Sequence, residues 1–287
     1  MTIFFTAVVI FDGWLDGSLT ASAADDRAVQ SAGCLPAGTI LCVLIALLII
    51  PAQLELSKLA AAKNLKIFPP VSIIASILFA TCWYWQQLIE TPSQIYLFFL
   101  SAFVLLALLL YQYMRYGTSA VFANCGANYF SIIYVGLLSG FVLAIRLDFG
   151  LWPLLMFVFV VKSADIGAYA IGAPFGRHKF SPKISPSKTW EGMGGAVAAA
   201  VIVAIIFARI FGIMSWWLAV IFGLCFAFIG QLGDLVESMI KRDAEQKDSV
   251  NPDSIGIPGF GGVLDIIDSP LLAAPFAYLF FMFGLAQ

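Results

Sequence analysis

The sequence has little charge and almost no histidine. Only 11% of its 287 residues are Asp, Glu, Lys or Arg, and His178 is the single histidine, which excludes a histidine-rich metal site. The five cysteines form no CxxC pair, so neither a zinc site nor a disulfide framework is indicated. The chain also lacks a GxxxxGK[ST] loop, a GxSxG elbow and an HExxH helix. These absences leave a chain whose few charges must be explained one by one.

Apolar sequence makes up most of the chain, with 61% hydrophobic residues. A helix that crosses a bilayer needs about 20 predominantly apolar residues. Nine runs approach this length, the first of them short: Thr2–Leu15, Gly38–Leu56, Val71–Ile89, Ser93–Tyr113, Asn128–Ile145, Leu151–Gly172, Gly192–Phe211, Trp216–Ile240 and Val263–Leu285. We therefore expect an all-α, polytopic integral membrane protein with about nine transmembrane helices and no soluble domain.

The first run has two interpretations. Thr2–Ile10, followed by Ala21-Ser22-Ala23, resembles the apolar core and cleavage site of a signal peptide. However, no Lys or Arg precedes the core, and Asp12 and Asp16 lie between core and cleavage site. These features favour a helix that is retained, and the topology of the rest is the same in either case.

The basic residues indicate the orientation, because cytoplasmic connections are enriched in Lys and Arg. With the N-terminus inside, eleven of the fifteen basic residues fall in cytoplasmic connections and three in outer ones, while Lys162 lies within a span. We expect the N-terminus and both polar motifs described below to face the cytoplasm from the cell (inner) membrane. Glu55, near the inner end of the second run, is either a functional residue or an interfacial residue satisfied by Lys58 or water, and we favour the second interpretation.

Two charges interrupt the span at residues 151–172. Lys162 and Asp165 are three residues apart, so they share a helix face and can pair. Ionisable groups inside a membrane usually face a bundle interior or a wet cavity. The pair is therefore either a self-neutralising structural ion pair or part of a site, and we favour a site role for Asp165.

The next connection, residues 172–192, is rich in Pro, Ser and Lys. As a whole it fits an ordinary positive-inside loop, but Ser185-Pro-Ser-Lys-Thr-Trp-Glu-Gly192 differs. Its hydroxyls, Ser185 and Ser187 among them, stand just before a Gly-rich helix start, where free backbone N–H groups can hold phosphate. Lys188 would then act as a compact positive charge on that phosphate.

A second polar segment runs from Gly230 to Ser269. Asp234, Ser238 and Lys241 are spaced i, i+4, i+7 and lie on one helix face. Asp265 and Asp268 are three apart at the start of the last run. Acids from two helices below a Lys-rich loop suit Mg²⁺, which is usually held by one or two carboxylates plus substrate phosphates. The alternative is a polar helix end that caps a bundle.

The polar loop between these acids ends in Pro258-Gly-Phe-Gly-Gly262. Glycines such as Gly261 and Gly262 allow a ligand to approach the backbone closely.

Four motifs in this order resemble the phosphatidate cytidylyltransferase family, also called CDP-diacylglycerol synthases. The similarity spans about Lys162 to Pro275 and rests on GAY at Gly167–Tyr169, SPSKTWEG at Ser185–Gly192, GDLVESMIKRDAEQKDS at Gly233–Ser249 and GGVLDIIDS at Gly261–Ser269. The resemblance implies transfer of CMP from CTP to phosphatidate with release of pyrophosphate. It also implies Mg²⁺, with a second cation such as K⁺.

The resemblance further implies roles for single residues. Asp234 and Asp265 would be metal ligands, with Ser238 and Asp268 nearby. The catalytic residues would be Lys188, Asp165 and Lys241, and the substrate-binding residues Ser185, Ser187, Lys247, Gly261 and Gly262. Two positions depart from the family pattern: Phe260 stands where His is usual, and Ile266 where Arg is usual.

These implications assign residues 1–150 to a lipid-side scaffold of transmembrane helices and residues 151–287 to the cytidylyltransferase site. The expected partners are CTP, phosphatidate entering from the inner leaflet, membrane lipid and a second copy of the chain, with no nucleic acid. The alternatives are a CTP-dependent polyprenol or lipid kinase, which needs a base for its alcohol substrate, and an ion-coupled transporter using Lys162 and Asp165. The transporter leaves both cytoplasmic motifs unexplained.

Overall fold

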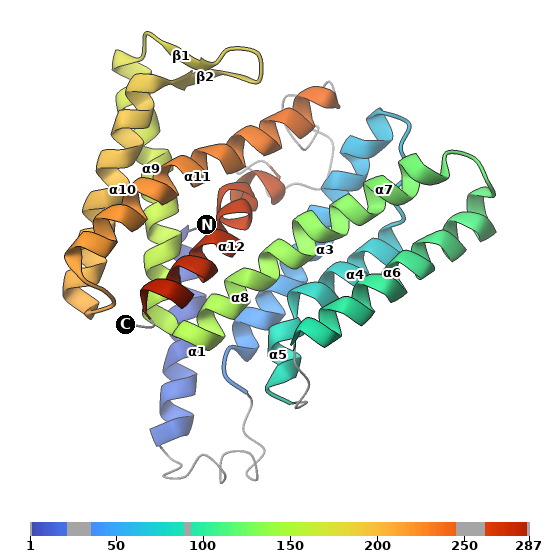
Figure 1. The fold of residues 1–287 in the computed structure, drawn as a ribbon, viewed down its shortest axis with the longest axis horizontal. Helices are drawn as coiled ribbons and strands as arrows, with labels where there is room; N and C mark the ends of the chain where they lie inside the picture. The colour runs from blue at the N-terminus through green and yellow to red at the C-terminus, as the bar shows by residue number, and fades with distance from the viewer. Residues whose placement is uncertain (1, 22–35, 89–92, 245–261, 286–287) are drawn as a thin grey trace. The chain divides into compact units, whose positions relative to one another are not determined.

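The structure is a computed structural model that describes residues 2–21, 36–88, 93–244 and 262–285 (Figure 1). The chain divides into two compact units, Met1–Gln53 with Ile67–Leu151, and Leu54–Lys66 with Trp152–Gln287. The sequence-based division after residue 150 did not anticipate that Leu54–Lys66 groups with the second unit.

In its described residues the first unit consists of helices joined by turns. It contains α1 (Thr2–Ala21), the first half of α3 (Thr39–Ala62), α4 (Pro69–Ala80), α5 (Cys82–Gln86), α6 (Ser93–Tyr116), α7 (Val121–Ser131), the π-helix η1 (Ile132–Leu137) and α8 (Leu138–Phe149). A buried apolar cluster that includes Phe68, Phe79, Leu108 and Ile132 holds α4, α6, α7 and η1 together.

Buried polar side chains also connect helices of the first unit. Gln53 Nε2 donates to Ser76 Oγ (2.7 Å) and to the Ser131 carbonyl (3.0 Å). Asn128 Oδ1 accepts from the Phe68 N–H (2.6 Å) and from Ser72 Oγ (2.9 Å). Because a membrane interior offers no water, such groups must find partners within the protein.

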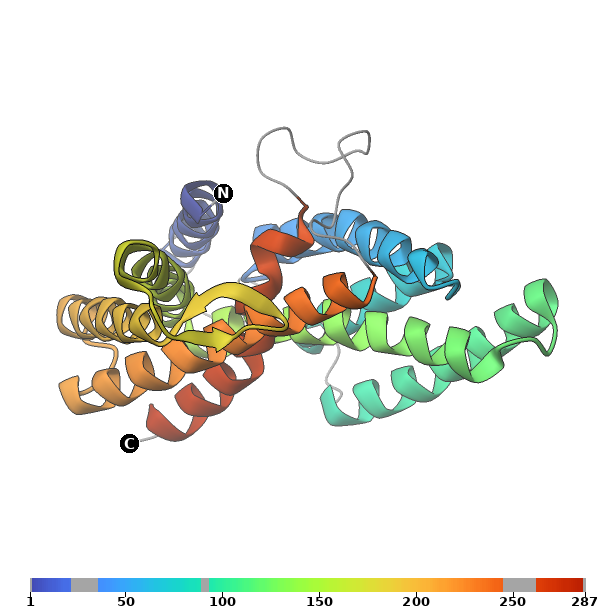
Figure 2. The same cartoon turned by 90° about the horizontal axis from the view of Figure 1, so that it is seen from above.

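The second unit contains α9 (Leu151–Phe175), β1 (Lys179–Ser181), β2 (Ser185–Thr189), α10 (Trp190–Phe211), α11 (Trp216–Asp243) and α12 (Leu264–Gly284). The two strands form an antiparallel hairpin in which Lys179 pairs with Thr189. Figures 1 and 2 show α10, α11 and α12 side by side, with the hairpin joining α9 to α10.

Small residues set the spacing of these helices. A Cβ added to Gly167 on α9 would lie 2.4 Å from the Gly195 carbonyl oxygen on α10, and one added to Gly223 on α11 would lie 2.6 Å from Val201 Cα on α10. Close backbone approach of this kind is typical of membrane helices.

Seven helices within the described ranges are long and apolar enough to cross a membrane: Thr39–Ala62, Ile95–Tyr116, Val121–Phe149, Leu151–Phe175, Trp190–Phe211, Trp216–Asp243 and Leu264–Gly284. The expectation of a helical, multi-pass membrane protein is therefore confirmed, apart from the short hairpin. The count of about nine is not. The expected first span yields a shorter apolar helix, Phe5–Trp14. The expected span Val71–Ile89 breaks at Thr81, whose φ and ψ of −93° and 6° separate α4 from α5.

A buried ion pair fixes α1 within the first unit. Asp12 Oδ2 lies 3.1 Å from Arg146 Nε at the end of α8, and Asp12 Oδ1 accepts from the N–H groups of Ile40 (3.1 Å) and Leu41 (3.4 Å) in the first turn of α3. Asp12 thus neutralises a buried cation and caps a helix whose first N–H groups have no partner within the helix.

We predict that Arg146→Leu strongly destabilises the protein, because removing one partner of a buried ion pair costs about 3–5 kcal/mol. Thermal unfolding in detergent measures the effect. Arg209→Leu is the matched control, because Arg209 is exposed in the last turn of α10. The double variant Asp12→Asn/Arg146→Leu should recover part of the loss. Equal melting temperatures for both arginine variants would contradict the role of the pair.

Candidate functional site

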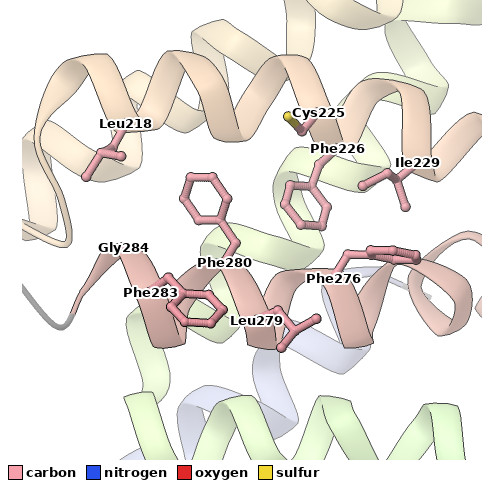
Figure 3. A pocket seen from close by; sticks show the side chains of 9 residues that line it. All are labelled: Leu218, Cys225, Phe226, Ile229, Phe276, Leu279, Phe280, Phe283 and Gly284. Carbon is pink, nitrogen blue, oxygen red and sulfur yellow. The ribbon is translucent and has the colours of Figure 1, made fainter.

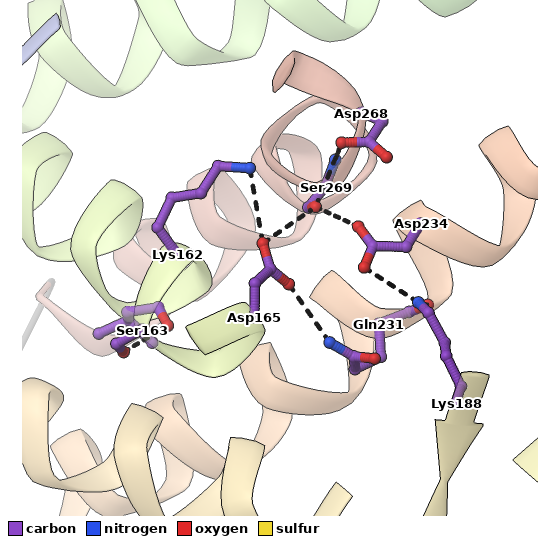
Figure 4. Close-up of polar contacts among 9 residues, drawn as sticks. Lys162, Ser163, Asp165, Lys188, Gln231, Asp234, Asp268 and Ser269 are labelled. Atoms are coloured by element: carbon purple, nitrogen blue, oxygen red, sulfur yellow. Dashed lines mark hydrogen bonds and ion pairs between the residues drawn. The ribbon is translucent and has the colours of Figure 1, made fainter. Parts of the chain in front are cut away.

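Asp165 lies in the middle of the second unit, on the face of α9 that looks toward α11 and α12 (Figure 4). Its Oδ2 atom is 3.5 Å from Lys162 Nζ, so the pair expected one turn apart forms. Its Oδ1 atom accepts a hydrogen bond from Gln231 Nε2 on α11 (3.2 Å). Asp165 therefore forms a hydrogen bond to α11 in addition to its ion pair within α9.

Lys188 links the hairpin to α11. The last residues of β2 direct its side chain inward, where Nζ donates to the Gln231 carbonyl (3.0 Å) and to Asp234 Oδ2 (3.0 Å). Thr189 next to it caps α10 by accepting the Gly192 N–H (3.1 Å), which fixes the point where the strand becomes a helix. The lysine is thereby held by backbone structure on both sides.

Three carboxylates converge on the hydroxyl of Ser269. Its Oγ atom is hydrogen-bonded to Asp234 Oδ1 and lies 3.4 Å from Asp165 Oδ2 and 3.3 Å from Asp268 Oδ1. Asp268 Oδ1 also accepts the Ser269 N–H at 2.7 Å. Figure 4 shows the side chains arriving from α9, α11 and α12. One hydroxyl proton serves only one acceptor at a time, so the group has more acceptors than donors.

This convergence depends on a glycine. A Cβ added to Gly233 would lie 2.9 Å from Ser269 Cα and 3.1 Å from the Asp268 carbonyl oxygen. Any larger residue at this position would push α12 away from α11. Asp234, next in the chain, reaches Ser269 because α12 approaches so closely.

A second charged cluster lies on α11 and the first turn of α12. Lys241 Nζ is 2.7 Å from Asp265 Oδ1 and 2.8 Å from Glu237 Oε1. Glu237 and Lys241 are both buried, and Asp265 is more accessible, with 21% of its side chain exposed. The cluster therefore holds one cation between two carboxylates at the start of α12.

Glu55 caps the N-terminus of α12. Its two carboxylate oxygens accept the N–H groups of Val263 (2.8 Å) and Leu264 (2.9 Å), and the side chain is buried. A carboxylate at a helix N-terminus is stabilised by the free N–H groups and by the helix dipole. The expectation that Lys58 or water satisfies Glu55 was wrong, because its hydrogen-bond partners are backbone groups about 200 residues further along the chain.

The hairpin is the exposed side of the site. Ser185 and Ser187 lie on its surface with their hydroxyl oxygens 3.4 Å apart. Glu191 accepts from the His178 N–H (3.2 Å) and contacts His178 Nδ1 (2.6 Å), which ties the two ends of the hairpin together. The two serines are thus available to a ligand that approaches Lys188 from outside.

The structure brings together four of the predicted residues, Asp165, Lys188, Asp234 and Asp268. Lys241 and Asp265 form the neighbouring cluster instead, and Ser238 is half-buried one turn beyond Asp234. Gly262 is buried just before α12, while Lys247 and Gly261 lie outside the described residues.

Sequence reasoning missed Ser269 and Gln231 as members of these clusters, and it placed Glu237 beside Asp234 and Lys241 without assigning it to the site. Gln231 and Glu237 lie three residues on either side of Asp234 on α11, and this spacing could have indicated both. A serine after an aspartate carries no such signal.

The carboxylate group fits a cation chemically. Lys162 is bonded to Asp165 and Lys188 to Asp234, so the three carboxylates and these two ammonium groups leave one negative charge in excess. Hard oxygen donors of this kind are the ligands that Mg²⁺ prefers. Within the described ranges no three His, Cys, Asp or Glu side chains are already arranged as a metal-binding cluster. Such an incomplete set matches an ion that takes part of its ligands from substrate phosphates.

Residues 29–283 match the cytidylyltransferase family. The chain belongs to the cytidylyltransferase family. It is similar to a phosphatidate cytidylyltransferase of Bacillus subtilis, with 34% identity over 238 residues that cover 79% of this chain and 84% of the relative. A Haemophilus influenzae protein of the same name is 44% identical over 138 residues, 46% of each chain. One of Brucella suis is 39% identical over 132 residues, 46% of this chain and 47% of the relative.

These matches confirm the resemblance that the four motifs indicate. The family match covers both units of the fold, whereas the motifs themselves all lie in the second. The match therefore includes the polar centre and the helices from α3 onward, while α1 lies outside the matched residues.

We predict that Gly233→Ala destabilises this cytidylyltransferase, because a side chain forced against the backbone of Ser269 and Asp268 costs about 1–3 kcal/mol. Gly194→Ala is the control, since a Cβ on Gly194 meets nothing within 4 Å and alanine favours helix. Melting temperatures in detergent should fall for the first variant and stay equal or rise for the second. A stable Gly233→Ala protein would show that the α11–α12 crossing does not depend on the glycine.

Proposed function

We propose that the protein is a phosphatidate cytidylyltransferase that transfers CMP from CTP to phosphatidate and releases pyrophosphate. The observation that carries the proposal is the convergence of Asp165, Asp234 and Asp268 on Ser269, with Lys188 bonded to Asp234, in a chain of the cytidylyltransferase family. The names of the related proteins supply the substrate class.

The reaction joins two anions. A phosphate oxygen of the lipid attacks the α-phosphorus of CTP, a new P–O bond forms, and the bond from the α-phosphorus to the bridging oxygen of pyrophosphate breaks. The attacking oxygen is already charged, so no general base is required. The barrier comes from charge repulsion and alignment, which enzymes overcome with fixed opposite charges and positioning. This explains a site rich in carboxylates and lysines.

Two lysines, Lys188 and Lys241, would bind the phosphate groups of CTP. Lys188 reaches the site from the exposed hairpin, so a triphosphate approaching Ser185 and Ser187 would meet its ammonium group. Lys241 is held between Glu237 and Asp265 and can offset charge that develops on the departing pyrophosphate. Gln231 and Lys162 keep Asp165 oriented toward Ser269.

We propose Asp234 and Asp265 as the residues that would hold Mg²⁺, with Ser238 and Asp268 close to them, and Asp165 as a further carboxylate that adds negative charge beside the ion. A second cation such as K⁺ would neutralise the remaining carboxylate charge. When bound, Mg²⁺ would screen the triphosphate and polarise its α-phosphoryl group.

The proposal includes an orientation. The excess of Lys and Arg on one side favours an inner-membrane protein with its N-terminus and site in the cytoplasm, where CTP is available. Phosphatidate would then enter sideways from the inner leaflet. About nine membrane segments, counting the two shorter apolar helices as inserted, and a homodimer complete the proposed assembly.

Labelled CTP tests the reaction. We predict that the purified protein transfers label from the α-phosphate of CTP to phosphatidate, and that Asp234→Asn lowers this turnover at least about 100-fold, as loss of a group that stabilises charge in the transition state does. Asp243→Asn is the control on the same helix. The Asp243 side chain is 77% exposed, and its Oδ1 atom lies 3.8 Å from Lys63 Nζ, an exposed ion pair that contributes little to stability.

Transfer of γ-label to a lipid alcohol instead would identify a CTP-dependent lipid kinase. No transfer of either label by folded protein would overturn the proposed function.

Removal of divalent cations should abolish turnover, and titration with Mg²⁺ separates the acids. We predict that Asp265→Asn raises the Mg²⁺ concentration for half-maximal rate about 10- to 100-fold, the range typical of a weakened metal site. Asp268→Asn should lower the maximal rate with a smaller change in the Mg²⁺ requirement, because this side chain is engaged with Ser269. The reverse pattern would make Asp268 the ligand and Asp265 the positioning residue.

A further inference from the structure

An apolar groove runs between α11 and α12, with a volume of about 410 Å³ (Figure 3). Among the residues that line the groove, Cys225 is the one whose side chain contains an atom other than carbon and hydrogen. The other walls are aliphatic and aromatic, among them Leu218, Ile229, Phe276, Leu279 and Phe283. Its size lies within the range of roughly 300–1,000 Å³ that small-molecule sites occupy.

The groove is lined by α11 and α12, the same two helices that carry Asp234 and Ser269. Ile229 stands five residues before Asp234 on α11, or about 7.5 Å at the rise of an α-helix. On α12, Phe276 follows Ser269 by seven residues, or about 10 Å. From Ile229 the groove extends to Leu218, about 16 Å further along α11. An extended apolar chain attached to a phosphate at the site would have this length and direction.

The surroundings decide what kind of molecule occupies such a groove. Leu279 is 46% exposed and Phe276 50%, so the groove is open at its side rather than closed within the protein. Both helices are long and apolar enough to span a membrane, so this open side lies at the depth of lipid hydrocarbon. A polar ligand would find no partner there.

We propose that this groove binds one acyl chain of the phosphatidate substrate and thereby positions the lipid phosphate beside Asp234 and Ser269. The inference rests on the proposed function and assigns the lipid subsite within it. The groove selects by shape rather than by hydrophobicity, because the bilayer offers an acyl chain an equally apolar environment. Its effect is therefore on the affinity for long-chain phosphatidate and not on CTP.

Filling the groove tests the proposal. Leu279→Trp should raise KM for a phosphatidate with 16-carbon chains about three- to tenfold, with KM for CTP and for a phosphatidate with six-carbon chains unchanged. Met282→Trp is the matched control, because Met282 is 41% exposed on the same helix and does not line the groove. Should Leu279→Trp fail to fold, Cys225→Phe takes its place, with Leu224→Phe as its control.

A phosphatidate carrying a photoactivatable diazirine in mid-chain gives a second measurement that does not depend on turnover. Its adducts should map to groove residues on α11 and α12 and should decrease in Leu279→Trp but not in Met282→Trp. Equal KM values for the two tryptophan variants at both chain lengths, with adducts elsewhere, would overturn the proposal. A change in oligomeric state caused by Leu279→Trp alone would show that a second copy covers the groove and would overturn it as well.

The two proposals fail separately. If the wild-type protein does not transfer CMP to either phosphatidate, the proposed function fails, while the crosslinking pattern still reports on the groove. If the wild-type protein is active but the variants behave alike, only the acyl-chain subsite fails.

Discussion

Three carboxylates share one hydroxyl in the second unit, and this arrangement constrains everything around it. Placing Asp165, Asp234 and Asp268 together within membrane-spanning helices is costly, because charge is poorly solvated there. The cost is offset by Lys162 and Lys188, by the Ser269 hydroxyl and by the Gln231 amide. Each of these groups comes from a different segment, so hairpin, α9, α11 and α12 must all be in place for the site to form.

Close helix packing makes this arrangement accessible. Gly167 against Gly195 and Gly233 against Ser269 bring backbones near enough for short side chains to meet. Serine and aspartate have short reach, so a spacing set by larger residues would leave the polar groups apart. The apolar helices and their glycines are thus as much part of the site's chemistry as its charged residues.

The sequence was sufficient to find the polar residues, and to pair Lys162 with Asp165 on one helix, but not to pair residues on different elements. Lys188, Asp165, Asp234 and Asp268 stand out because charge in an apolar chain is rare, and helical periodicity assigns each to a face. Their partners depend on how helices cross, which periodicity does not specify. Ser269 and Glu55 show this limit. The first is an ordinary residue made important by its neighbours, and the second caps a helix some 200 residues away.

The span count failed for a related reason. An apolar run predicts that a segment prefers lipid, not that one helix continues through it, and Thr81 ends α4 within such a run. The hairpin at residues 179–189 was equally hidden, because its strands are short and polar and are held by contacts with Glu191 and the start of α10.

The cap that Glu55 provides has a consequence for how this protein could be divided. Glu55, in the C-terminal part of α3, accepts the N–H groups at the start of α12. The unit that holds the site therefore includes residues from α3 as well as residues 152–287. A fragment beginning at residue 151 would carry every motif of the family and still lack the group that satisfies Val263 and Leu264. A break after residue 150 or after residue 66 would therefore place Glu55 and the start of α12 on different fragments.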